Sequence, residues 1–127
     1  VIDHFRAHGV PFLVVDSDGD VRELVPLFIE LGLDAMYPFE VQAGMDVNVL
    51  QDRYHGRAVW IGGVHKHRLA GGEREIAAEL ERLRPAVERG GYMPMADHNV
   101  PADVPWEHYR TYLRLKREIL NIAPPAV

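Results

Sequence analysis

Residues 58–98 read AVWIGGVHKHRLAGGEREIAAELERLRPAVERGGYMPMADH, and they contain one complete strand–helix–strand unit. Residues 58–61 form a short apolar run, which is typical of a buried strand. Glu73–Arg89 predicts an amphipathic helix, and Tyr92–Ala96 predicts the strand that follows it after two glycines. A strand, a helix and a second strand in this order indicate two parallel strands joined by a crossover. The apolar stripe of the helix follows a period of about 3.6 residues and consists of Ile76, Leu80, Leu83 and Val87.

The rest of the chain repeats this alternation. Apolar runs predict two earlier strands, at residues 11–15 and 33–38. Periodic or capped segments predict helices at residues 2–8, 20–31, 46–54 and 106–122, and Pro124-Pro125 is expected to end the fold. Four βα units with short glycine turns favour one α/β domain over residues 1–127, with four parallel strands in sequential order. A doubly wound sheet and half of a (βα)8 barrel both fit this pattern.

Composition excludes several classes of protein. The chain has 127 residues, 47% of them hydrophobic and 26% charged, which excludes a disordered or fibrous protein. No apolar run approaches the length of a membrane span, and a net charge of −5 without a basic patch argues against nucleic acid as a partner. The lack of cysteine excludes disulfides, thiolate ligands and a cysteine nucleophile, and it fits a cytoplasmic protein. Because the chain starts at Val1, we expect a longer natural product.

Titratable residues follow each predicted strand. Asp16-Ser17-Asp18-Gly19-Asp20 follows the first strand, Glu40 the second, His65-Lys66-His67 the third and Asp97-His98 the fourth. The turns at the opposite end are plain glycine turns. Ligands of parallel α/β folds bind at the carboxyl ends of the strands. The sequence therefore predicts that Asp16, Glu40, His65 and Asp97 lie at one end of the sheet and that this end carries the site.

The chemistry of these residues stays open at this point. Carboxylates and imidazoles together suit zinc, manganese or iron(II), and they also suit general acid–base catalysis. The aspartates after the first strand could instead cap the next helix, and the histidines around Lys66 could lie in a solvated loop. The stretch at residues 14–19 also resembles haloacid-dehalogenase-type phosphatases, but Asp20 stands where that family has threonine, and the later acidic motif of that family is missing.

A second resemblance covers nearly all of residues 9–120. It rests on Asp16-Ser17-Asp18-Gly19 and on residues 37–46, 61–66, 90–94 and 97–101, in order and at the right spacing. These motifs resemble the uroporphyrinogen decarboxylase superfamily. The superfamily fold is a (βα)8 barrel, and this chain resembles its C-terminal half, strands five to eight. The resemblance thus implies that the N-terminal half of the barrel is absent here.

The resemblance also implies two activities. One is decarboxylation of the acetate side chains of uroporphyrinogen, which needs no cofactor. The other is methyl transfer to or from a corrinoid carried by a partner protein, usually assisted by zinc. In the methyltransferase branch a His-x-Cys pair follows the fifth strand, and Asp16 and Asp18 stand in that place, with His98 near the third ligand position. The resemblance therefore implies zinc or another divalent metal on Asp16, Asp18 and His98, with His98, Glu40 and Asp97 as catalytic candidates.

Of the two branches, the methyltransferase-like one is preferred. The acidic face would repel a substrate rich in carboxylates such as uroporphyrinogen. We therefore expect a corrinoid-linked, metal-assisted methyltransferase that acts on a small methoxy, alcohol or amine compound. The decarboxylase is the alternative, and an inactive half-barrel fragment is the third possibility. A half barrel exposes two sheet edges and one sheet face, so we also expect a homodimer.

Overall fold

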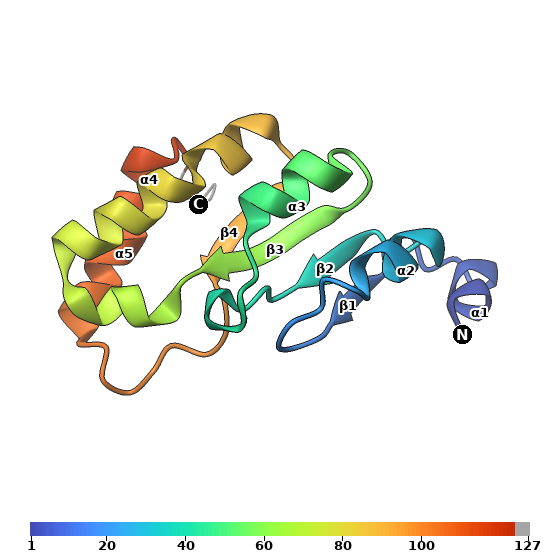
Figure 1. Ribbon diagram of the computed structural model, residues 1–127, viewed down its shortest axis with the longest axis horizontal. Coiled ribbons are helices and arrows are strands. Elements are labelled where there is room, and N and C mark those ends of the chain that lie inside the picture. Colours follow the sequence, from blue (N-terminus) through green and yellow to red (C-terminus); the bar gives the residue numbers. More distant parts are fainter. Residues whose placement is uncertain (124–127) are drawn as a thin grey trace.

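The computed structural model describes residues 1–123 as an α/β fold (Figure 1). The predicted end at Pro124-Pro125 lies outside the described residues. The strands are β1 (Val14–Asp16), β2 (Ala35–Tyr37), β3 (Val59–Val64) and β4 (Tyr92–Ala96). The α-helices are α1 (Ile2–Ala7), α2 (Val25–Glu30), α3 (Val47–Tyr54), α4 (Glu73–Arg89) and α5 (Trp106–Ile119). Two 3-10 helices, η1 (Val41–Ala43) and η2 (Lys66–Gly71), follow β2 and β3.

The strands form a single four-stranded sheet in the order β1-β2-β3-β4, and every neighbouring pair is parallel. Both the parallel pairing and the sequential order were predicted from the sequence and are confirmed. Helices α2, α3 and α4 connect successive strands, as expected for parallel crossovers. The carboxyl ends of all four strands consequently lie along one edge of the sheet.

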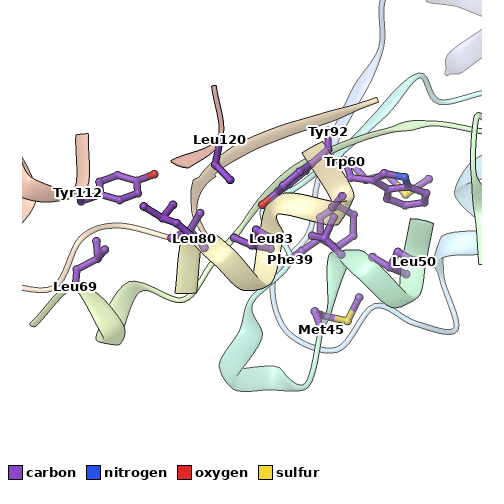
Figure 2. Close-up of a cluster of buried hydrophobic side chains, with 14 of the residues drawn as sticks. Phe39, Met45, Leu50, Trp60, Leu69, Leu80, Leu83, Tyr92, Tyr112 and Leu120 are labelled. Carbon is purple, nitrogen blue, oxygen red and sulfur yellow. The ribbon is translucent and has the colours of Figure 1, made fainter. Parts of the chain in front are cut away.

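One face of the sheet carries the hydrophobic core. Met36, Trp60 and Tyr92 occupy matched positions on β2, β3 and β4, and all three are buried. They pack in one cluster with residues of the helices, including Leu50 of α3 and Leu83 of α4. Figure 2 shows this cluster running from Trp60 and Leu50 at one end to Leu69 and Tyr112 at the other. Helices α3 and α4 therefore gain stability by burying apolar side chains in this cluster.

The opposite face of the sheet is apolar but open to solvent. Side chains alternate between the two faces along a strand, so residues one position away from the buried row point to this second face. Val14 of β1 and Met93 and Met95 of β4 lie there, and all three are exposed. Ile61, the register partner of Met93, is half-buried. The structure thus leaves an apolar sheet face with little cover.

The helix expected at residues 20–31 is shorter than predicted. The carbonyl oxygen of Val21 accepts the N–H groups of Leu24 and Val25 and so closes a turn, and the helix begins only after it, at Val25. Pro26 fits this start, because proline is favoured in the first turn of a helix. Leu24 and Leu31 are exposed, whereas Val25 is fully buried. The last helix ends at Ile119 and not at Ile122.

A close backbone approach at the end of β3 brings the loops after β2 and β3 together. Gly62 has a φ of +110°, and a Cβ there would lie 1.9 Å from the carbonyl oxygen of Pro38. Gly63 donates its N–H to the same oxygen at 3.0 Å. Only glycine allows this contact, since any side chain at residue 62 would displace Pro38. The segment that carries Glu40 is thereby fixed against β3.

Within residues 1–123, no helix combines the length and the apolar character that a membrane crossing requires.

Candidate functional site

Polar residues from all four loops meet at the carboxyl edge of the sheet. Asp16 is the last residue of β1, His65 directly follows β3, and Asp97 directly follows β4. Glu40 lies between β2 and η1. The prediction that these residues share one end of the sheet is confirmed.

Asp97 anchors two of the loops. Its side chain is fully buried, and its carboxylate accepts the Val41 N–H at 2.8 Å and the Lys66 N–H at 3.0 Å. Its own N–H donates to Val64 of β3. Because a buried carboxylate needs such partners, these bonds fix the start of η1 and the start of η2. A catalytic role for Asp97 stays a prediction, but both of its oxygens are already engaged.

Glu40 and Lys66 form the central ion pair of this edge. The Lys66 ammonium donates to Glu40 Oε1 at 2.9 Å, and the Gly19 N–H donates to Glu40 Oε2 at 3.0 Å. The hydrogen bond from Lys66, followed by that from Gly19, lowers the pKa of Glu40 below its ordinary value. The same pair raises the pKa of Lys66. Glu40 is therefore ionised at neutral pH and ties the loop after β1 to the loop after β3.

Asp18 and His98 are brought together from the loops after the two outer strands, β1 and β4. His98 Nε2 lies 3.8 Å from Asp18 Oδ1, and both side chains are at least partly exposed. Asp16 is also exposed, and within the described residues it makes no ion pair or side-chain hydrogen bond. Two of the three expected ligands, Asp18 and His98, thus approach each other, and the third lies two residues before Asp18.

The donor set partly fits a divalent metal. Two ligands of one tetrahedral zinc ion lie about 3.4 Å apart, given bonds of about 2.0–2.2 Å to nitrogen and oxygen. The Asp18–His98 distance of 3.8 Å is close to this value. Among residues 1–123, however, no three histidine or acidic side chains gather closely enough to hold a metal ion. The described chain therefore offers two donors that fit such an ion and not a complete shell.

A second network surrounds Arg82 of α4, and the sequence did not reveal it. Arg82 of α4 donates to Glu79 at 2.7 Å, to Asp46 at 3.1 Å and to the carbonyl oxygen of Gly63 at 3.1 Å. Glu79 in turn accepts the His65 N–H at 2.9 Å. The network joins α4, the start of α3 and the end of β3, and so fixes the start of the loop after β3.

Lys66 is the residue of the edge that sequence reasoning missed. Its neighbours His65 and His67 carry imidazoles, which commonly bind metals, yet His67 contacts Gln42 Oε1 at 3.1 Å and lies in an exposed position. The available signal was the single lysine between two histidines after a strand that ends in two glycines. That signal is ambiguous because a lysine in such a loop is more often solvated.

Comparisons with models of known protein families, with curated proteins and with solved structures give no match.

Proposed function

We propose that this chain is the C-terminal half, strands five to eight, of a (βα)8 barrel of the uroporphyrinogen decarboxylase superfamily. The support is a sequential parallel sheet whose helices bury one face, while Val14, Met93 and Met95 expose the other. In a closed barrel the second face is the interior, filled by apolar side chains from every strand. A second (βα)4 half, in the same polypeptide or in a second copy of this chain, covers that face.

We propose further that the complete barrel is a corrinoid-linked, metal-assisted methyltransferase for a small methoxy, alcohol or amine compound. The observation that carries this proposal is the approach of Asp18 Oδ1 to His98 Nε2 at 3.8 Å. These two side chains would hold zinc or a similar divalent ion, with Asp16 as the nearest further carboxylate in the chain. When bound, the ion polarises the oxygen or nitrogen of the substrate. A corrinoid on a partner protein is the other methyl carrier.

The charge at this edge supports the methyltransferase branch. Asp16, Asp18 and Glu40 contribute three carboxylates, and Lys66 neutralises only Glu40. A substrate that itself carries several carboxylates would be repelled from such a surface. A small neutral or cationic compound would not.

The decarboxylase remains the second candidate because the described residues gather two metal donors and not three. Decarboxylation in this superfamily needs no metal. In that reading His98 acts on the substrate directly, as a hydrogen-bond donor or an acid.

Zinc binding separates the two candidates. We expect His98→Ala and Asp18→Ala, and also Asp16→Ala, to weaken zinc binding at least about tenfold by calorimetry, since even outer-shell losses reach that size. Glu73→Ala on the outer helix α4 is the control and should bind zinc normally.

These measurements belong on the whole polypeptide in which the chain occurs, so that all ligands are present. Absence of zinc binding, together with decarboxylation of a tetrapyrrole, would overturn the methyltransferase proposal in favour of the second candidate.

A further inference from the structure

Lys66 has an unusual position for a lysine in a surface loop. Its side chain is only 12% exposed, and that of its partner Glu40 is 21% exposed. In the described part of the chain, Glu40 is the one carboxylate within salt-bridge distance of the Lys66 ammonium. An ion pair whose two side chains are largely covered is screened less by salt than a fully exposed pair.

The contact continues from Glu40 to the loop after β1. The second oxygen of Glu40 accepts the N–H of Gly19, the residue next to Asp18. Gly19 has a φ of +77°, so this turn depends on glycine. Among the described residues, the backbone groups of Asp18 and Gly19 have no other hydrogen bond to the rest of the fold. Asp18 is therefore held from both neighbours: Ser17 before it donates its N–H to the carbonyl oxygen of Tyr37 at 2.9 Å, and the Glu40 carboxylate holds Gly19 after it.

The backbone of Lys66 is held at the other side of the site. Its N–H donates to the buried carboxylate of Asp97, the residue before His98. Lys66 thus contacts Glu40 through its side chain and Asp97 through its backbone. Glu40 holds the residue after Asp18, and Asp97 is the residue before His98. Asp97 also accepts the N–H of Val41, next to Glu40, so the loops after β2 and β4 are joined at a second point, but Lys66 alone among the described residues donates to the Glu40 carboxylate through its side chain.

We infer that Lys66 is a positioning residue of the proposed site. Its ammonium orients Glu40, Glu40 holds Gly19, and the Asp18 carboxylate consequently stays within reach of His98. This inference rests on the proposed function for the meaning of the Asp18–His98 pair, but the restraint on Gly19 is a property of the fold itself. The competing interpretation is an ordinary ion pair that stabilises the protein and leaves the loop after β1 unaffected.

The test compares Lys66→Met, which removes the charge and keeps the length of the side chain, with Lys66→Arg, which keeps the charge. Arg114→Met is the matched control, because Arg114 also makes ion pairs, with Glu73 at 2.9 Å and Glu118 at 3.0 Å, away from the site. Three quantities are measured in the whole polypeptide: amide hydrogen exchange at Gly19, the affinity for zinc alone, and the midpoint of thermal unfolding.

We expect Lys66→Met to accelerate exchange at Gly19 about tenfold or more, because the amide loses its oriented acceptor. Zinc affinity should fall by about 10–100-fold, the range found when an outer-shell partner is lost. Lys66→Arg should stay within about threefold of the unmutated protein in both readouts, since a single charge-assisted contact suffices. Arg114→Met should change the unfolding midpoint at most and leave both readouts unaltered.

Unchanged exchange at Gly19 in a folded Lys66→Met protein would overturn the inference, even if the unfolding midpoint falls. Faster exchange at Gly19 in a protein that never binds zinc would support the positioning role of Lys66 and contradict the metal-dependent function. The two proposals can therefore fail separately.

Discussion

At the residue scale, the carboxyl edge of the sheet is organised by two carboxylates with different tasks. Asp97 is buried and holds the backbones of the loops after β2 and β3. Glu40 is partly exposed and links the Lys66 side chain to the loop after β1. The sequence predicted that both lie at this edge but could not separate their roles. Burial and hydrogen-bond partners depend on how the loops fold back, and no local pattern encodes that.

Replacing Asp97 should destabilise the protein strongly. In Asp97→Asn one backbone N–H would face an NH2 group and lose its acceptor in a buried position. We expect a loss of about 2–4 kcal/mol in the free energy of unfolding, measured by urea denaturation. The exposed Asp103→Asn is the control and should change that free energy by less than about 0.5 kcal/mol. A loss as small as the control's would show that Asp97 does not anchor the loops.

The ion pair of Glu40 predicts a pH dependence of stability. Because the folded pKa of Glu40 lies below its ordinary value of 4.5, the unfolded chain binds the proton more tightly. The stabilisation from ionised Glu40 is therefore complete above about pH 5 and is lost as the pH falls through the folded pKa. We expect the stability difference between the unmutated protein and Glu40→Gln to shrink between about pH 5 and pH 3 in denaturation series. A difference independent of pH would contradict the pairing.

At the element scale, the sequence predicted the regular segments better than the connections. Glu73–Arg89 was predicted with both boundaries correct, because its apolar stripe is long and glycines flank it. The helix at residues 20–31 was predicted too long. A turn takes the place of its first residues, and tertiary packing, which a local sequence pattern does not encode, decides where that turn ends. The 3-10 helix Lys66–Gly71 was missed, since a single short turn leaves no periodic pattern. Lys66 was missed with it.

The end of β3 gives a prediction for an element. Gly62→Ala would place a methyl group against the Pro38 carbonyl, where the available distance is 1.9 Å. The loop after β2 must then shift, and Glu40 shifts with it. We expect the free energy of unfolding to fall by more than about 2 kcal/mol in urea denaturation. Gly9→Ala, also at positive φ but with nothing within 4 Å, controls for backbone strain alone and should cost less.

At the scale of the whole molecule, the asymmetry of the sheet is the main observation. All of the large core lies on the helix side, yet the other face presents methionine and valine to solvent. Exposed apolar surface of this kind marks a place where another part of a protein packs. The sequence predicted the parallel order and the half-barrel alternative together, but alternation of apolar residues alone cannot distinguish a face that helices cover from one that a second half-barrel covers.

Thiol labelling tests the half-barrel account most directly, because the chain contains no cysteine. Met93 on the open sheet face and Val49 on the outer surface of α3 are matched in exposure, at 58% and 60%. Met93→Cys and Val49→Cys are each introduced into the protein as its natural source produces it, and the rates of modification are compared. The account predicts that the thiol at residue 93 reacts at least about tenfold more slowly, because the closed barrel buries it. Equal rates would show that this face stays open and would contradict the account.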